Sequence, residues 1–482
     1  MSLWKIAWRS IQQRGLASAL TVVSMALGVM MVVAVLSVHG VVAESFQNNS
    51  SLSYNLIVGA RGGKLQLTLN TVYYLSQPVE NIPYAFYLEF LSDDVRDAEY
   101  EHARPESMDE SELGRSGKYA QFTAVAIPLC MGDYLSRFRV VGTTPDMFTE
   151  LKFGPMADRP YTFSDGRNFE TWNDEHGYFE AVLGAMVAWE LGLKVGDEIS
   201  PSHSDPEGEG HAEKFTVVGI LEPTGTPNDR AAFVNIEGFY LMEDHSKPLD
   251  EEEEVTGEPV GELATERDHD HDAGGPRRDR LPIDQREVTA ILLRTINPFV
   301  AVSLPNSINE SMQALCVAPI REITQLFTVI VNPIQLALLS VTGLICLVSG
   351  ISILVSIYNS MSDRRHEIAV MRALGASRST VMSVILLESI LLSLLGGIAG
   401  WLGGHGLNWL ASGEIERRSG VSIGFFDLAP PLNIEYLGLA PIIGWIPPEL
   451  FLIPALVVLA VIVGFLPALS AYRTDVAESL GA

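Results

Sequence analysis

Two stretches of this chain begin like motifs that do chemistry. His366 and Glu367 open an HEIAV stretch that starts like the zinc-protease motif HExxH, but Val370 stands where the second histidine would be. The segment GARGGK starts like a phosphate-binding loop, yet Gly59 is too close to the next glycines, and Leu65 follows the lysine in place of Ser or Thr. No G-x-S-x-G elbow and no complete ATP-binding motif occurs. The sequence therefore predicts a protein that is not an enzyme.

A third stretch has the residue types of a metal site. Histidine and aspartate alternate in RDHDHD, and imidazole combined with carboxylate suits zinc, so the candidate ligands are His269, Asp270, His271 and Asp272. They lie in an acidic segment, 243–286, that contains almost no aromatic residues and therefore has little apolar surface to offset the entropy of ordering. We expect a disordered, solvated segment that is dispensable for folding, with metal capture as the alternative.

Four apolar runs must position these polar segments. The first, 15–43, has no charged residue up to position 38 and can cross a bilayer core of about 30 Å at about 1.5 Å per residue. A cleaved signal peptide is the alternative, but the run is longer than the usual apolar region of about 7–15 residues. Three further transmembrane helices are predicted at 331–358, 381–410 and 450–472. The fold class is thus an α-helical membrane protein.

Residues 44–330 have a different character from the apolar runs. Short β-type segments alternate there with helical segments and with Gly- and Pro-rich turns. We predict a large α+β extracytoplasmic domain inserted between transmembrane helices 1 and 2, in which 99–118 is a charged loop and 303–327 is largely helical. The remaining segments are predicted as an amphipathic interfacial helix (1–14), an extracytoplasmic loop (411–449) and a cytosolic tail (473–482).

Basic residues set the predicted orientation. Lys5, Arg9 and Arg14 precede the first span, and four arginines lie in the short turn between the second and third spans. Because clustered Lys and Arg in short loops mark the cytoplasmic side, both termini are predicted to be cytoplasmic.

Composition excludes some partners. The formal net charge of −27 argues against nucleic acid as a partner. Cys130 and Cys316, both expected outside the cytosol, show no CxxC spacing, so unpaired thiols are favoured and a disulfide is the alternative.

The turn between the second and third spans, 359–380, carries the most specific pattern. Gly375 can end its short helix, and Ser377 can cap the helix that follows. Its core EIAVMRALGAS, with Arg365 ahead of it and Glu388 in the next span, resembles the permease signature of the FtsX/LolC/MacB class of ABC transporters. The segments FRVVGTTPDMF, EAVLGAMVAWELGLKVGD and KFTVVGILEPTGTPNDRAAFVNIEGF are similar to the MacB-type periplasmic core, and the ending GFLPALSAYRTDVAESL is similar to that of the family.

The resemblance implies a function and a set of partners. The turn would be a cytosolic coupling helix that docks on a separate ABC ATPase, which holds the ATP and Mg²⁺, while this chain binds no cofactor directly. The residues implied at the contact are Arg364, Arg365, Glu367, Met371, Arg372, Leu374 and Gly375. A second permease subunit, identical or different, would complete a dimer in the inner membrane, and an extracytoplasmic adaptor is a further candidate partner.

Two functions from different classes are compatible with this pattern. In the first, the permease subunit transmits ATPase-driven motion to its extracytoplasmic domain, which exports or extracts a lipid, lipoprotein, peptide or similar substrate. In the second, the chain is a membrane-anchored sensor or scaffold whose extracytoplasmic domain binds a ligand, with a link to metal. A cytosolic ATPase partner separates the two, because a scaffold needs none.

Glu388 is the one acidic residue inside the third apolar run. A carboxylate at the centre of a membrane helix costs about 2.5–3.5 kcal/mol on insertion scales. We therefore expect Glu388 to lie toward the cytosolic end of its span, to face protein and to form a structural bond. A proton relay is the alternative, and the resemblance disfavours it because the acid recurs in members with unrelated substrates.

Overall fold

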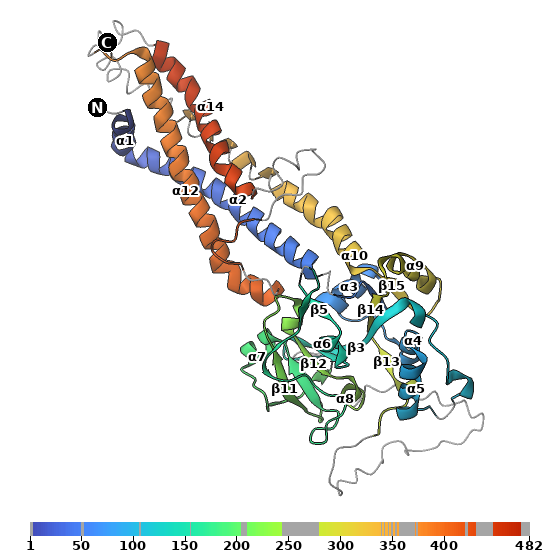
Figure 1. Ribbon diagram of the computed structural model, residues 1–482. Helices are drawn as coiled ribbons and strands as arrows, with labels where there is room; N and C mark the ends of the chain where they lie inside the picture. The colour runs from blue at the N-terminus through green and yellow to red at the C-terminus, as the bar shows by residue number, and fades with distance from the viewer. Residues whose placement is uncertain are drawn as a thin grey trace, which may run out of the picture. The chain divides into compact units, whose positions relative to one another are not determined.

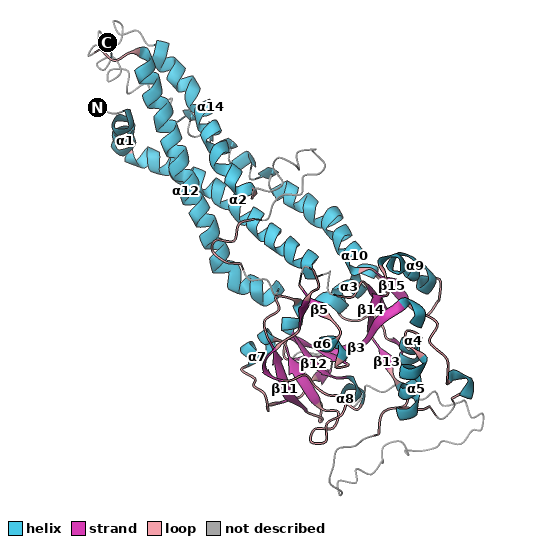
Figure 2. Cartoon of the chain, in the orientation of Figure 1, coloured by secondary structure: helices cyan, strands magenta, loops and turns pink. Residues whose placement is uncertain are grey.

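The computed structural model describes residues 3–49, 53–105, 108–154, 156–203, 210–242, 279–338, 375–419, 423–429 and 447–473, with some positions between 340 and 372. The chain divides into two compact units. The α+β unit is Phe46–Leu326, and the helical unit is formed by Met1–Ser45 and Phe327–Ala482. In the described part of the chain, strands occur only in the α+β unit (Figure 2).

One large sheet organises the α+β unit. Among the described residues it has eleven strands, in the order β15-β1-β14-β3-β4-β12-β8-β11-β7, with β10 beside β3 and β9 beside β11. Neighbouring strands are antiparallel except for β4 with β12 and β8 with β11, which are parallel. The strands of this sheet are β1 (Leu56–Gly59), β3 (Thr123–Leu135), β4 (Phe138–Thr143), β7 (Phe163–Gly166), β8 (Glu180–Leu183), β9 (Glu198–Ile199), β10 (Ser202–His203), β11 (Phe215–Leu221), β12 (Ala231–Asn235), β14 (Ala290–Thr295) and β15 (Leu315–Val317).

The core of this unit follows from the composition of its strands. Strands β1, β4, β8 and β12 are buried at every position, as expected when a sheet is covered on both faces. Two short pairs lie outside the main sheet, β2 (Ile82–Pro83) with β13 (Glu287–Val288) and β5 (Lys152–Phe153) with β6 (Arg159–Pro160). The helices of the unit are α3 (Lys64–Tyr73), α4 (Tyr84–Leu88), α5 (Asp93–His102), α6 (Asp146–Thr149), α7 (Ala185–Leu191), α8 (Ile236–Tyr240), α9 (Pro298–Asn309) and α10 (Pro319–Leu326).

Both cysteines of the α+β unit are buried and unpaired, as the sequence favoured. Burial raises the pKa of the Cys130 thiol to about 12, although a hydrogen bond with the Tyr240 hydroxyl, 3.3 Å away, opposes the shift. Burial also raises the pKa of Cys316. Because the thiolate is the reactive form, both side chains behave as small apolar residues of the core.

The range 303–327 is largely helix, as predicted, because α9 covers it up to Asn309 and α10 covers Pro319–Leu326. The prediction missed the strand between these helices: Leu315–Val317 forms β15, whose Val317 lies opposite Ile57 of β1 at the edge of the sheet. The range 99–118 is not simply a charged loop. It packs around the buried Arg96 of α5, which contacts the carboxylates of Glu89 and Glu112.

Long helices make up the helical unit. They are α1 (Leu3–Gln13), α2 (Gly15–Asn49), α12 (Arg378–Ser419) and α14 (Leu452–Arg473), with the short helix η7 (Pro448–Phe451) ahead of α14. The described part of the chain has four helical stretches long and apolar enough to cross a membrane: Gly15–Gly40, Pro319–Ile345, Arg378–Ile415 and Pro448–Phe465. Helix α12 continues beyond the predicted limit of 410, and it runs alongside α14 (Figure 1).

Glycines let α12 approach α2 closely. Gly396, Gly400 and Gly404 are spaced by four residues and therefore share one face of α12. A Cβ at Gly400 would lie only 2.5 Å from the carbonyl oxygen of Ala26, and one at Gly404 only 2.7 Å from the Cβ of Val33. Small residues at such positions are how helices pack in lipid, where the hydrophobic effect does not drive association. The glycine-rich stretch of α12 thus forms a helix contact within the subunit, with α2.

Candidate functional site

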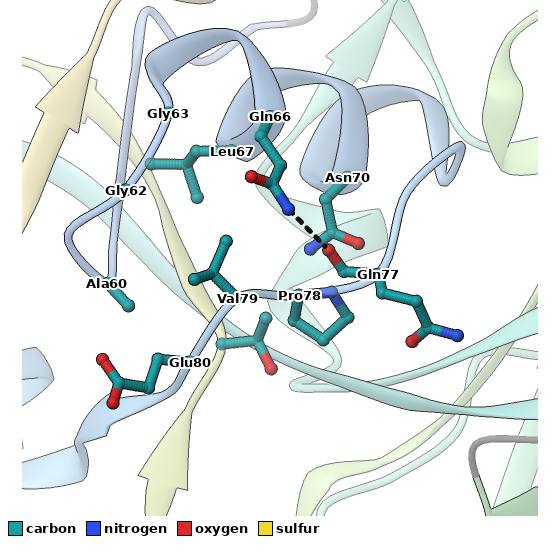
Figure 3. A pocket seen from close by; sticks show the side chains of 11 residues that line it. Ala60, Gly62, Gly63, Gln66, Leu67, Asn70, Gln77, Pro78, Val79 and Glu80 are labelled. Carbon is teal, nitrogen blue, oxygen red and sulfur yellow. Dashed lines mark hydrogen bonds between the residues drawn. The ribbon is translucent and has the colours of Figure 1, made fainter.

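The Gly-rich loop after β1 borders a pocket that is also lined by α3 and by the segment around Pro78 and Val79 (Figure 3). The pocket has a volume of about 20 Å³, and its wall is closed partly by the amide of Gln66, which donates to the Gln77 carbonyl oxygen at 3.5 Å. A space of that size holds about one water molecule.

Within the predicted coupling helix, 359–380, we call residues 364–378 the coupling segment; it is described only at Arg372 and from Gly375 onward. Arg364, Arg365, Glu367, Met371 and Leu374 lie outside the described residues, as do the four metal candidates His269, Asp270, His271 and Asp272. Of the implied contact residues, Arg372 and Gly375 are described.

Gly375 has the conformation expected of a helix stop. Its φ is +99°, in the left-handed region, and its N–H donates to the Arg372 carbonyl oxygen at 3.0 Å. A Cβ at this position would meet nothing within 4 Å, so the backbone conformation requires glycine here, whereas space does not. Ser377 then caps α12, because its Oγ accepts from the Thr380 N–H at 3.1 Å. The coupling segment therefore joins α12 through a defined turn.

Glu388 holds α1 against α12. Its carboxylate accepts a hydrogen bond from the Ser10 hydroxyl at 2.8 Å and one from the Arg14 guanidinium at 3.0 Å. Glu388 is 1% exposed and Ser10 is 4% exposed, so this contact is shielded from solvent. We call Ser10, Arg14 and Glu388 the Glu388 cluster. A carboxylate that faces protein and carries a cationic partner is the expected solution for an acid in a membrane helix.

The Glu388 cluster lies on the same helix that follows the coupling segment. Glu388 is ten residues after Arg378, or about 15 Å along α12 at 1.5 Å per residue. The sequence predicted that Glu388 would face protein in a structural bond, and the observed contacts agree. It did not identify Ser10 and Arg14, which are more than 370 residues away. Their spacing of four residues, just before the first span, is a signal that could have suggested them.

The apolar side chains of α1 differ in their exposure. Ala7 and Ile11 are buried with Ser10, whereas Trp4 and Trp8 are 55% and 44% exposed. The exposed tryptophans line an open groove of about 490 Å³ together with Lys5, Arg9, Gln12 and Leu391. Tryptophan beside basic residues is typical of helices that lie at the membrane–water interface.

A second buried acid fixes α12 farther along its length. The Oε2 of Glu449, in η7, lies 2.9 Å from Nε2 of His405, and its Oε1 accepts from the Ser37 hydroxyl at 2.7 Å and from the Ala429 N–H at 2.8 Å. We call these residues the Glu449 cluster. It joins α2, α12 and η7, and the sequence analysis did not identify it.

The two clusters are separated by most of a membrane thickness. Glu388 and His405 are seventeen residues apart on α12, which corresponds to about 26 Å of helix rise, against a bilayer core of about 30 Å. Helix α12 is therefore bonded to α1 near one end of the bundle, and to α2 and η7 near the other.

Two family models match the chain. One, described as MacB-like periplasmic core domain, matches residues 18–257, and the other, described as FtsX-like permease C-terminal, matches residues 339–476. The second match includes the coupling segment, Glu388, His405 and Glu449.

Similar proteins carry related names. The chain is 33% identical over 89 residues to an uncharacterized ABC transporter permease, YknZ, of Bacillus subtilis, covering 18% of this chain and 21% of that protein. It is 25% identical over 145 residues to the macrolide export ATP-binding/permease protein MacB of Rhodopirellula baltica, covering 30% of this chain and 20% of MacB. It is 26% identical over 311 residues to the lipoprotein-releasing system transmembrane protein LolC of Xylella fastidiosa, covering 63% of this chain and 65% of LolC.

The matched segments span between about a fifth and two thirds of these relatives. Permeases of this type work with ABC ATPases in general. The apolar helices and the family together indicate an inner-membrane protein. The chain, with its MacB-like periplasmic core domain and its FtsX-like permease domain, belongs to the FtsX/LolC/MacB-type ABC transporter permeases.

Proposed function

We propose that this chain is a permease subunit that transmits ATPase-driven motion along its transmembrane helices to its extracytoplasmic α+β domain. That domain would then export or extract a lipid, lipoprotein, peptide or similar substrate. ATP and Mg²⁺ are held by a separate cytoplasmic ABC ATPase, and this chain needs no cofactor for transmission. A second permease subunit completes a dimer, and an extracytoplasmic adaptor is a further partner.

The observation that carries this proposal is the way α12 is fixed. The helix starts three residues after Gly375, at the end of the coupling segment, and continues for 42 residues, or about 63 Å. The Glu388 and Glu449 clusters bond it to its neighbours, so a displacement of the coupling segment is transmitted along the bundle. A membrane anchor for a sensor would not need two buried acids at this spacing, because each costs free energy to insert.

The coupling segment itself provides the test. Glu367→Lys reverses a charge, and Met371→Asp removes an apolar anchor, at positions where the resemblance implies contact with the ATPase. Each variant is expected to insert and form its dimer normally, but to lose co-purification with the ATPase and to lose the ATPase turnover of the reconstituted complex. The measurements are pull-down of the ATPase and phosphate release, beside the unsubstituted chain.

A charge reversal elsewhere serves as the control. Glu310, at the C-terminal end of α9, is exposed, so Glu310→Lys makes the same change in the other unit and should leave both measurements unchanged. If Glu367→Lys and Met371→Asp keep full complex formation and turnover, the segment only sets topology, and the coupling role is wrong. If no ATPase co-purifies with the unsubstituted chain, the sensor or scaffold function is favoured.

A labelling experiment tests the orientation, which places both termini in the cytoplasm and 44–330 outside. Single cysteines at Gln47 and Ser377 are expected to react with a membrane-impermeant maleimide from opposite sides, Gln47 from outside and Ser377 from inside. Cys130 and Cys316 should contribute little background because both are buried with raised pKa values. Cys346→Ser removes the third thiol. Labelling of both positions from the same side would contradict this topology.

A further inference from the structure

Three side chains of the α+β unit converge at a site that the sequence analysis did not identify. The Nδ1 of His203 lies 3.2 Å from Oδ1 of Asp133, and the Nε2 of His211 lies 3.3 Å from Oδ2 of the same carboxylate. One ligand-type atom from each residue lies within 4.8 Å of the other two. The two imidazole rings are nearly perpendicular, at 84°, with centroids 6.1 Å apart, so they face the carboxylate and do not stack on each other.

The pairing of the strands brings these three side chains together. The register of β3 against β4 shifts between Met131 and Tyr134, which is a bulge of the kind that redirects a side chain, and Asp133 lies within it. Strand β10 pairs with β3 so that His203 is directly opposite Asp133. The chain then returns at Gly210, which bridges to Ser202, and the His211 N–H donates to the Pro201 carbonyl oxygen at 2.8 Å. The convergence is therefore built into the strand pairing.

The two nitrogen–oxygen distances, one to each oxygen of the Asp133 carboxylate, can be compared with those in a zinc site. Zinc binds imidazole nitrogen and carboxylate oxygen at about 2.0–2.2 Å, so neighbouring ligands of a tetrahedral site are about 3.3–3.5 Å apart. The two nitrogen–oxygen distances at Asp133 are close to this value. Two histidines and one carboxylate are also a donor set that zinc uses when it keeps a fourth position for water or an outside ligand.

The three side chains of the site differ in their exposure to solvent. The side chain of Asp133 is 0% exposed and that of His211 is 9% exposed, whereas that of His203 is 52% exposed. A buried carboxylate is costly without a compensating positive charge. The exposed side of His203 gives an ion an entry path and leaves a coordination position facing solvent.

From this geometry we infer that Asp133, His203 and His211 bind a divalent transition-metal ion, for which zinc is the expected choice. The ion would fasten the short strand β10 and the return at His211 to β3, which otherwise depend on a two-residue ladder. The site is independent of the coupling function, and it is distinct from the acidic segment that contains His269 and His271.

The test is zinc titration of the purified full-length chain in detergent after chelator treatment, with zinc alone as the probe. The unsubstituted chain is expected to bind one zinc at this site, and His211→Ala and the near-isosteric Asp133→Asn are each expected to abolish it. Cobalt(II) in place of zinc should give visible d–d absorption that the same variants remove. Hydrogen exchange of the backbone at Ser202, His203 and His211 should slow when zinc is added.

Two control variants separate this site from other histidines. His176→Ala changes a histidine that also lies near a carboxylate, 3.9 Å from Glu175, but has no second histidine in the arrangement, so it should leave zinc binding unchanged. The double variant His269→Ala/His271→Ala should likewise retain the site. The inference is overturned if the unsubstituted chain binds no zinc, or if binding survives both His211→Ala and Asp133→Asn. In either case, Asp133 and its histidines form only a structural hydrogen-bonded cluster.

Discussion

Gly400→Leu is expected to prevent α2 from packing against α12 and to leave little monodisperse protein after solubilisation. The new Cβ would lie 2.5 Å from a backbone oxygen of α2 and 2.7 Å from the Cβ of Val29. Overpacking in a well-packed core costs about 1–3 kcal/mol, and we expect at least the upper end because no rotamer change can move a backbone atom. The measurement is the melting temperature and the size-exclusion profile of the purified variant. Gly400→Ala should show a smaller loss.

A glycine of the same helix provides the matched control for that substitution. A Cβ at Gly413 would meet nothing within 4 Å, so Gly413→Leu adds the same apolar side chain to α12 without a clash. Its melting temperature should remain close to that of the unsubstituted chain. Equal melting temperatures for Gly400→Leu and Gly413→Leu would mean that the close approach of α2 and α12 does not stabilise the bundle.

Glu388→Ala is expected to detach α1 from α12. Hydrogen bonds between helices in a membrane contribute about 0.6–1.7 kcal/mol each, so loss of the Ser10 and Arg14 bonds should weaken the attachment by about 1–3 kcal/mol. That free energy corresponds to a change of about 5- to 150-fold in the population of detached α1. Hydrogen exchange of residues 3–14 in reconstituted membranes measures the effect, and the exchange should become faster.

Two further variants show whether charge or hydrogen bonding holds α1. Glu388→Gln keeps an acceptor for Ser10 but removes the charge that pairs with Arg14, so its exchange should be intermediate. Glu414→Ala removes an exposed carboxylate from the same helix and should have no effect on α1. Unchanged protection of α1 in Glu388→Ala would contradict an anchoring role for this acid.

Local features of this protein could be predicted from the sequence. Long apolar runs indicated the membrane-spanning helices, because only a helix or a closed barrel satisfies the backbone in lipid. The left-handed conformation of Gly375 and the capping role of Ser377 were expected from residue type and position alone. Each of these inferences depends on a few neighbouring residues.

Features that depend on distant residues could not be predicted. Leu315–Val317 is a short apolar run, and such a run can be strand or helix until its partner, here β1, is known. The charged range 99–118 was predicted to be a loop, because the sequence does not show that Arg96 is buried and gathers its carboxylates. Asp133 resembles any acidic residue near a turn, and only the pairing of β10 with β3 brings His203 opposite it.

The pairing of β1 with β15 determines how the α+β unit can be loaded mechanically. The chain from α2 enters the sheet at Leu56, and the chain to α10 leaves the sheet after Val317. The two strands are antiparallel, and Ile57 lies opposite Val317. Both connections therefore attach at the same end of the strand pair. Pulling the two connections apart would peel the strands one residue pair at a time, starting at Ile57 and Val317. Pulling both in the same direction would distribute the load over the whole ladder, including β14 on the other side of β1. We therefore expect the unit to resist a pull on both connections in the same direction better than a pull that separates the two connections.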